Sequence, residues 1–491
     1  MALLHADVCI IGNELSGFVA GALLAQRGHR VVLIDYAPAY ETKLLGDYFA
    51  PTFPHIWQMP KSGPVAHVFD TLELRTELKR SLEPKATMAF IHDPHERIIT
   101  DPDKQKFNAE LYRAFGEYGS KISWSLTQFD AASRDPLYIE ASFLNESSLW
   151  GTLKAKKRIA KSLYAATISG NTRLAKPLLK QPLADFLSAL LPFVQYQASL
   201  PLESIGGHLA LKAFQNGNCS PVFEHTSSYS ILKSIFAESF LRHGGEILQN
   251  QTILKIETRK KQITQIHLNG PNNYMPDTVI DAGYAKDLSQ FMTDTSLSIM
   301  LKTHESLVSL VGQTTICRWL LPRSLIPKPM PTLAASLFFE KEQESKSILG
   351  IFNPWKHPSL HQSNETLPES HLALVVMATW SAEADDKKNI EFLKISAERL
   401  LPFAYSKRLA EDTITKEEAN WIWPQFTAQG KGLNRLSGRP LYTPLSNLLR
   451  AARDVAPALG IDGEIAVAEA VSKAVKTLLD KKDRILLGKR T

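Results

Sequence analysis

The sequence predicts an α/β fold, and three stretches carry this prediction. At the amino end, a strand, a glycine-containing turn, a helix and a second strand follow one another within residues 8–35. In the middle of the chain, residues 244–281 have the pattern of consecutive strands, and residues 464–479 have the composition of a helix. Strands and helices that alternate in this way are typical of a parallel sheet covered by helices.

The opening unit is built from three short elements. Residues 8–11, Val-Cys-Ile-Ile, suit a strand that is buried on both faces. Residues 18–27 have helical composition and stop at Gly28, a residue type that is common just after a helix. Residues 30–34 then predict a second strand, which completes a βαβ unit.

The turn of this unit resembles the dinucleotide fingerprint GxGxxG. Gly12 and Gly17 match its first and third glycines, and Asp35 follows Gly12 by 23 positions. In that fingerprint the acid bonds a ribose hydroxyl and the helix N-terminus faces a pyrophosphate. The second glycine is replaced by Glu14, which brings bulk and negative charge to a place that should accept an anion. The segment alone leaves two interpretations open, a nucleotide site and a structural βαβ unit without nucleotide.

Later stretches extend the α/β pattern. Residues 228–243 predict a helix, residues 244–270 a strand followed by a hairpin around 259–262, and residues 278–281 a buried strand. Further strands are expected over 307–311, 315–320, 333–339, 347–352 and 372–379, and one or two helices over 383–412. A mixed or antiparallel sheet fits the second group of strands.

Composition excludes several classes of protein. Of 491 residues, 44% are hydrophobic and the net charge is +6, so the chain is globular and its charge is too small to indicate a nucleic-acid partner. Three widely spaced cysteines argue against a disulfide framework and a zinc ribbon. No metal-binding spacing and no nucleophile elbow is present, so no metal ligand and no catalytic residue is predicted. A cytoplasmic location is expected, because neither a secretory signal nor a spanning helix is recognisable.

Three blocks, residues 7–35, about 225–285 and 445–480, together resemble the FAD-dependent oxidoreductases of the phytoene desaturase and flavin amine oxidase group. The resemblance implies an α/β fold with a Rossmann-like FAD/NAD(P)-binding domain, interleaved with a mixed-sheet and helical substrate domain. The implied domains are given by their segments: 1–50, 225–290 and 440–491 for the FAD-binding part, and 51–224 and 291–439 for the substrate or cap part, with a helical insertion over about 102–215.

The resemblance also implies a cofactor site, with FAD as the cofactor. Asp454 matches the acid that bonds the cofactor near its ribityl and phosphate region, and Gly460 and Gly463 match the glycines where the last helix begins under the flavin. The predicted cofactor-binding residues are Gly12, Asn13, Glu14, Leu15, Ser16, Gly17, Asp35, Arg453, Asp454, Gly460 and Gly463.

Three departures from the family pattern put FAD binding in doubt. The glycine before the C-terminal acid is Arg453, the glycine-rich turn after Asp35 is replaced by residues 40–43, and the Pro…Gly-Gly stretch reads Pro221 to Ser228 without glycine. Glu14 and Arg453 would both lie where the pyrophosphate belongs. Three interpretations stay open: an ion pair that fills the site, Arg453 paired with the phosphates while Glu14 turns outward, or two unrelated exposed substitutions.

A basic stretch adds a further hypothesis about partners. Eight basic and no acidic residues lie within residues 147–184, and an apolar helix-like segment, 182–202, follows. Peripheral membrane contact through 154–194 is one interpretation, and a solvated basic face over an ordinary helical cap is the other. The aromatic residues Trp421 and Trp423 predict either a packed core pair or a cavity lining.

Two functions follow from these observations. One is an FAD-dependent oxidoreductase that acts on an apolar small molecule. The other is a non-catalytic pseudoenzyme that has lost FAD and binds a protein partner, as in the Rab escort and GDP-dissociation-inhibitor proteins, which resemble this fold and work without a flavin.

Overall fold

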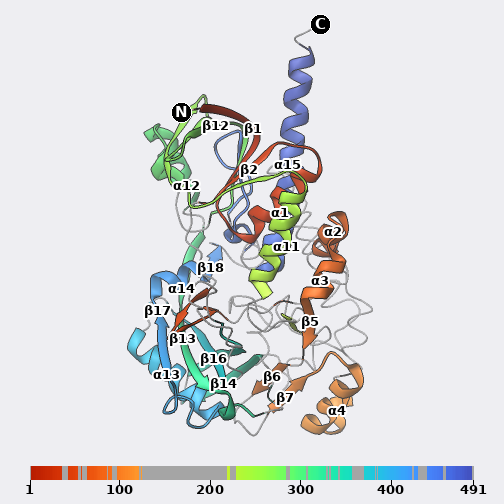
Figure 1. Cartoon of the computed structure of the whole chain (residues 1–491), viewed down its shortest axis with the longest axis vertical. Helices are drawn as coiled ribbons and strands as arrows, with labels where there is room; N and C mark the ends of the chain where they lie inside the picture. The colour runs from red at the N-terminus through yellow and green to blue at the C-terminus, as the bar shows by residue number, and fades with distance from the viewer. Residues whose placement is uncertain are drawn as a thin grey trace, which may run out of the picture.

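The computed structural model describes residues 2–35, 42–53, 57, 63–85, 87–90, 97–120, 123, 218–221, 228–283, 288–305, 308–327, 330, 333–340, 343–355, 370–381, 383, 385–422, 425–428, 439–456 and 460–488. Its elements form an α/β structure with two large sheets. Figure 1 shows one sheet, with β1, β2 and β12, toward the end of the molecule where α15 projects, and the other, with β13, β14 and β16, toward the opposite end.

The first sheet has seven strands drawn from separated parts of the chain. Its order is β10-β11-β12-β1-β2-β9, and β19 pairs with β12. The strands are β1 (Ala2–Ile11), β2 (Val31–Ile34), β9 (Glu246–Leu248), β10 (Ile253–Arg259), β11 (Gln262–Leu268), β12 (Asn272–Asp281) and β19 (Leu448–Arg450). The ladder from β19 through β12, β1 and β2 to β9 is parallel, and β10, β11 and β12 form an antiparallel meander.

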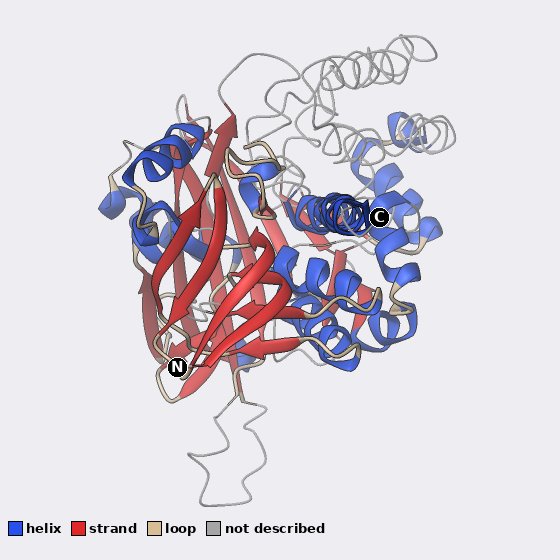
Figure 2. Ribbon diagram, turned by 90° about the horizontal axis from the view of Figure 1, so that it is seen from above, coloured by secondary structure: helices blue, strands red, loops and turns tan. Residues whose placement is uncertain are grey.

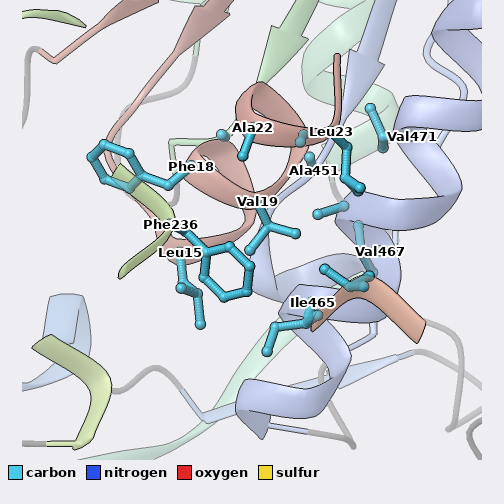
Figure 3. Close-up of a cluster of buried hydrophobic side chains, with 14 of the residues drawn as sticks. Leu15, Phe18, Val19, Ala22, Leu23, Phe236, Ala451, Ile465, Val467 and Val471 are labelled. Carbon is cyan, nitrogen blue, oxygen red and sulfur yellow. The ribbon is translucent and has the colours of Figure 1, made fainter. Parts of the chain in front are cut away.

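Three helices pack together beside this sheet. They are α1 (Leu15–Gln26), α11 (Ser228–Arg242) and α15 (Gly460–Gly488). Residues 15–25 of α1 are all buried, because α11 covers one side of α1 and α15 covers another. Figure 3 shows the contact: Val19 and Leu23 of α1 lie among Phe236 of α11 and Val467 of α15. The helix at the start of the chain is therefore held by segments from its middle and its end.

The second sheet has eight strands and is mostly antiparallel. Its order is β17-β13-β16-β15-β14-β6-β7, with β18 paired to β13. The strands are β6 (Thr87–Phe90), β7 (Arg97–Thr100), β13 (Val308–Pro322), β14 (Leu333–Glu340), β15 (Gln343–Phe352), β16 (His371–Ser381), β17 (Ala410–Ile414) and β18 (Gln425–Ala428). Helix α13 (Asp386–Leu400) covers its apolar face.

The remaining elements connect or cover the two sheets. They are β3 (Thr42–Leu45), β4 (Tyr48–Pro51), α2 (Gly63–Thr71), α3 (Arg75–Ser81), β5 (Leu82–Lys85), α4 (Lys104–Phe115), β8 (Asn218–Pro221), η2 (Leu288–Phe291), α12 (Thr295–Glu305), η3 (Arg323–Leu325), α14 (Lys416–Ile422) and η6 (Arg453–Val455). Figure 2 looks along α15 and shows this helix end-on beside the strands.

Two expectations from the sequence are corrected by the structure. The two strands expected over 307–311 and 315–320 are parts of one strand, β13, which begins at Val308. Of the one or two helices expected over 383–412, the structure has α13, which ends at Leu400, and residues 410–414 form β17, which pairs with β13. The other expected strands and helices are present, and the hairpin at 259–262 is formed by β10 and β11. Three of them are clearly longer than predicted: β1 begins at Ala2, β12 begins at Asn272, and α15 extends to Gly488.

Several sequence-based hypotheses fall outside the described residues. These are the basic stretch 154–180, the apolar segment 182–202, residues 222–227 with His225, Trp423, and the residues Tyr40 and Glu41. The proposed domain boundaries stay a prediction. Among the described helices, none combines the length and the apolar character that crossing a membrane requires.

Candidate functional site

The turn between β1 and α1 lies at the place where an open α/β sheet binds its ligand. Strand β1 is flanked by β2 on one side and β12 on the other, and both neighbours run parallel to it. The chain leaves β1 through Gly12, Asn13 and Glu14, and α1 begins at Leu15. Ligands of such sheets bind at the carboxyl ends of the strands, near a helix N-terminus. The fingerprint segment therefore lies where a pyrophosphate would be expected.

The two retained glycines of the turn are required by packing. Gly12 has a φ of +118°, and a Cβ atom there would lie 2.4 Å from the backbone carbon of Ala282, just after β12. A Cβ atom on Gly17 would lie 2.9 Å from the Cβ atom of Ala282. Neither position tolerates a side chain without movement of the neighbouring strand end. Their presence is therefore explained without a bound nucleotide.

Glu14 and Arg453 form the ion pair that was one of the three interpretations of the sequence. Arg453 Nη2 lies 3.5 Å from Glu14 Oε2, although the two residues are 439 positions apart. Arg453 also donates from Nε to Glu464 Oε1 at 2.7 Å, and the side chain of Glu464 is fully buried. One guanidinium from η6 thus contacts a carboxyl group at the start of α1 and another near the start of α15.

The hydroxyl group of Tyr229 joins the same cluster from α11. It lies 2.9 Å from Glu14 Oε2 and 3.0 Å from Glu464 Oε2, and it accepts a hydrogen bond from the Leu15 backbone N–H at 3.2 Å. The guanidinium carbon of Arg453 lies 5.4 Å from the centre of the Tyr229 ring. We call Glu14, Tyr229, Arg453 and Glu464 the closing cluster, since it draws together α1, α11, η6 and α15.

The closing cluster engages two groups that a pyrophosphate would use, the Leu15 amide and the Arg453 guanidinium. The Leu15 amide at the N-terminus of α1 is already bonded to Tyr229, and the carboxylate of Glu14 lies at the same helix end. Arg453, the cation at this place, is engaged by two carboxylates. A phosphate brought here would meet the carboxyl groups of Glu14 and Glu464 in a buried environment, where an added negative charge is costly. As arranged, the residues do not fit the pyrophosphate of FAD.

Burial and charge shift the pKa values in the closing cluster. Burial raises the pKa of Glu14 above its usual value; Glu464 raises it further, while Arg453 and Lys233 oppose the shift. Burial, followed by the charges of Glu14 and Glu464, raises the pKa of Tyr229. Burial by itself would lower the pKa of Arg453, but Glu464, Tyr229 and Glu14 raise it, so the guanidinium stays charged.

Asp454 belongs to a second buried charge cluster. Its Oδ2 atom lies 2.7 Å from Arg439 Nη1 and 3.5 Å from Arg450 Nη1, and Arg450 Nη2 lies 3.3 Å from Asp281 Oδ2. Asp281, Arg450 and Asp454 are each less than 5% exposed. The acid predicted to bond the ribityl and phosphate region is thus paired with arginines of this chain.

The other predicted site residues have mixed surroundings. Leu15 lies in the hydrophobic core (Figure 3), and the Ser16 hydroxyl donates to the Ala451 carbonyl. Asn13 is buried in the turn, and Asp35 follows the last residue of β2. Gly460 opens α15 with a φ of +55°, and Gly463 lies in the first turn of that helix.

Sequence reasoning missed two members of the closing cluster, Tyr229 and Glu464. An acid in the first turn of a helix is common, because it complements the helix dipole, so Glu464 gave no indication of a special role. Tyr229 lies in the predicted helix 228–243, where an aromatic residue predicts core packing. Only the register of α11 against α1 shows that its hydroxyl reaches Glu14.

One group of described residues has the types that hold metal ions. His5, Asp7 and Asp277 offer ligand atoms within 4.8 Å of one another. However, Lys482 pairs with Asp277, and Asp7 accepts the Arg30 backbone N–H at 2.8 Å. The lysine supplies the positive charge at this place, so the group does not point to a metal site.

Comparisons with known proteins define the fold. No family model matches the chain, and no curated protein matches it. Among solved structures, an oxidoreductase from Methanosarcina mazei matches at a TM-score of 0.55 and 14% identity, covering 96% of this chain and 100% of that one. Cyclohexylamine oxidase from Brevibacterium oxydans matches at 0.53 and 12%, covering 97% and 99%. The Rab GDI of Plasmodium falciparum matches at 0.54 and 12%, covering 95% and 97%.

These similarities extend over nearly the whole chain, and at such low identity they show the fold alone. The protein has the α/β, Rossmann-like fold of the FAD-binding oxidoreductases, which a Rab GDI also resembles. The fold class expected from the sequence is confirmed. The same fold is compatible with an enzyme and with a binding protein. The function therefore has to be inferred from the residues of the site.

Proposed function

We propose that this protein is a non-catalytic binding protein built on the fold of the flavin-dependent oxidoreductases, with a pyrophosphate site closed by its own side chains. The observation that carries the proposal is the bond between the Tyr229 hydroxyl and the Leu15 amide. That amide opens α1 and is the type of donor that a pyrophosphate uses in this fold. Here it is satisfied from within the chain.

The pattern of retained and lost glycines supports the same function. In the fingerprint, the first glycine permits the tight turn and the third permits close packing of the helix, whereas the second allows the backbone to approach the pyrophosphate. The packing around Ala282 requires Gly12 and Gly17. Glu14 replaces the one glycine that serves the ligand, and Arg453 replaces a second glycine of the family pattern.

A protein partner is the class of ligand that this proposal favours. One of the structures with this fold is a Rab GDI, whose name denotes a role toward another protein. An apolar small molecule remains the alternative ligand, and an FAD-dependent oxidoreductase remains the second candidate function. The second candidate is favoured by Asp35 and Asp454, which stand at the predicted acid positions, and by the oxidoreductases among the similar structures.

Absorbance and FAD titration of the purified full-length protein test the proposed function. We expect a colourless protein whose titration with FAD produces no binding heat, because Glu14, Tyr229 and Arg453 occupy the site. A yellow protein, or saturable uptake of one FAD per chain, would overturn the proposal and restore the oxidoreductase.

Variants of the protein then test whether the closing cluster is what prevents the binding of FAD. Glu14→Gly with Arg453→Gly restores both family glycines, and glycine is an acceptable residue at a helix N-cap. The double variant leaves Glu464 buried without its cation, so a triple variant adds Glu464→Gln. We expect FAD uptake to rise from the wild type through the double to the triple variant. Glu238→Gln, which changes an exposed acid of α11, serves as the matched control and should leave uptake unchanged.

A further inference from the structure

The Tyr229 hydroxyl contacts more acceptor atoms than it has hydrogens. A phenol offers one hydrogen and accepts through its oxygen. The Leu15 N–H donates to that oxygen at 3.2 Å. The single hydroxyl hydrogen then faces two carboxylate oxygens, Glu14 Oε2 at 2.9 Å and Glu464 Oε2 at 3.0 Å.

This arrangement lacks one hydrogen if both carboxylates are ionised. One of the two oxygen–oxygen contacts would then hold no hydrogen, and lone pairs would face each other at hydrogen-bond distance. The closing cluster would also carry two negative charges against the one positive charge of Arg453, in a site where Glu464 is fully buried. Two carboxylates that share a buried site do not ionise together at little cost.

We propose that Glu14 and Glu464 hold one proton between them at neutral pH, carried by Glu14, so that the closing cluster is a proton-binding site. The Glu14 O–H donates to the Tyr229 oxygen, the Tyr229 O–H donates to Glu464, and Glu464 pairs with Arg453. The hydroxyl's contacts with Leu15, Glu14 and Glu464 then each contain a hydrogen, and the positive charge of Arg453 balances the negative charge of Glu464. Through these hydrogen bonds, the proton on Glu14 connects α1 to Tyr229 of α11 and to Glu464 of α15.

The distances assign the proton to Glu14. Arg453 Nε lies 2.7 Å from Glu464, whereas Arg453 Nη2 lies 3.5 Å from Glu14. The nearer carboxylate gains more from the guanidinium and stays ionised. The raised pKa of Glu14, caused first by burial, and the raised pKa of Tyr229 agree with this assignment.

Among the residues that the structure describes, Lys233 is a further charged group that faces the closing cluster. Its Nζ atom lies 5.9 Å from the centre of the Tyr229 ring and 5.7 Å from that of Phe18, and its charge lowers the pKa of Glu14. On the neighbouring strands β12 and β19, Asp281 and Arg450 pair with each other. Lys233 therefore favours release of the proton, and burial and Glu464 favour its retention.

The direction of the pH dependence follows from linkage. A carboxyl group with a raised pKa in the folded state binds its proton more tightly than the unfolded chain does. Its contribution to stability is most favourable below the unfolded pKa of about 4.3. It is lost as the pH rises from there through the folded pKa, because the folded site must then hold a second negative charge.

Infrared spectroscopy of the full-length protein at neutral pH tests the proposal directly. We expect a C=O band of a protonated carboxyl group in the wild type that disappears in Glu14→Gln. It should also disappear in Glu464→Gln, where Glu14 has Arg453 to itself and ionises. The control Glu238→Gln should keep the band. A wild type without the band, or a band that survives Glu14→Gln, would overturn the proposal.

Thermal unfolding across the neutral and alkaline range gives a second readout. Glutamine imitates a protonated carboxyl group at every pH, so the stability of Glu14→Gln relative to the wild type should increase as the pH rises. If the stabilities of the two proteins changed with pH in the same way, the result would contradict the proposal. The inference deepens the proposed function of the same site, and its tests use no FAD. A failure of the proton assignment is therefore distinguishable from a failure of the proposed function, which the colour of the protein reveals.

Discussion

Glu14 is the residue at which this chain departs most clearly from a nucleotide-binding protein. Its side chain is 14% exposed and lies at the beginning of α1, 2.9 Å from the Tyr229 hydroxyl. A glycine there would leave the helix N-terminus open to an anion. The glutamate places its own carboxyl group there instead, in contact with Arg453 and Tyr229.

Tyr229→Phe tests the hydroxyl group that completes this arrangement. The substitution removes the partner of the Leu15 amide and one contact of each carboxylate. Since a buried polar group left without a partner costs about 1–3 kcal/mol, we expect the free energy of unfolding to fall by about that amount. Urea unfolding measures it. Tyr112→Phe, at a tyrosine that is 58% exposed, is the control. Equal effects of the two substitutions would contradict the role of Tyr229.

The sequence permitted half of the closing cluster to be predicted. Glu14 and Arg453 stand at positions where the family has glycine, so a pattern identified them, and the structure places them 3.5 Å apart. Tyr229 and Glu464 occupy positions where tyrosine and glutamate are ordinary helical residues. Their roles depend on the orientation in which α11 and α15 pack against α1. The sequence pattern of a single helix does not predict this orientation.

At the scale of elements, helix α1 depends on tight contacts at its beginning. The turn after β1 brings Gly12 and Gly17 against Ala282, while α11 and α15 cover the helix from the other sides. These contacts explain why a βαβ unit of the dinucleotide type persists here without the second glycine.

Gly12→Ala, compared with Gly28→Ala, tests whether packing retains the first glycine. Both residues have positive φ, +118° and +84°, but nothing lies within 4 Å of a Cβ at Gly28. Gly28→Ala should cost about 1–2 kcal/mol for the backbone conformation alone. Gly12→Ala adds a contact of 2.4 Å with Ala282, so its loss of stability should be clearly larger. The denaturant midpoints of the two variants and the wild type measure these losses of stability. Equal losses in the two variants would contradict the packing explanation.

The element predictions failed where long-range pairing decides the structure. Residues 410–414 have a composition that continues a helix, yet they form β17 because β13 supplies a partner from residues 316–320. The chain reverses before it at Phe403, whose φ is +70°. The N-terminal βαβ unit was predicted well because its strands, turn and helix are defined by local apolar runs and glycines.

At the scale of the whole molecule, the first sheet needs both ends of the chain. Strand β19 pairs with β12, β12 pairs with β1, and α15 packs against α1. The sequence indicated this arrangement through three separated blocks. Their order came from a resemblance, since pattern alone says nothing of which distant segments meet.

Arg318 joins the second sheet to the hairpin that follows the opening unit. This fully buried residue of β13 pairs with Asp412 and donates to the backbone carbonyls of Leu44 at 2.7 Å and Ala50 at 3.1 Å, in the β3–β4 hairpin. Lysine keeps the charge but has no planar fork of donors.

We therefore expect Arg318→Lys to lower the free energy of unfolding by at least about 2 kcal/mol, because buried carbonyl groups lose their donors. Chemical unfolding of the full chain measures the change. Arg323→Lys, at an exposed arginine just beyond β13, is the matched control and should have little effect. A variant as stable as this control would show that the contact contributes little.

The central claim is that the protein closes its own pyrophosphate site. The most direct measurement is an equilibrium titration of a fixed concentration of FAD with increasing wild-type protein, followed by the fluorescence of the flavin. The closing cluster of Glu14, Tyr229, Arg453 and Glu464 predicts fluorescence that stays unchanged at every protein concentration. Saturable quenching at one FAD per chain would contradict the claim and identify a flavoprotein.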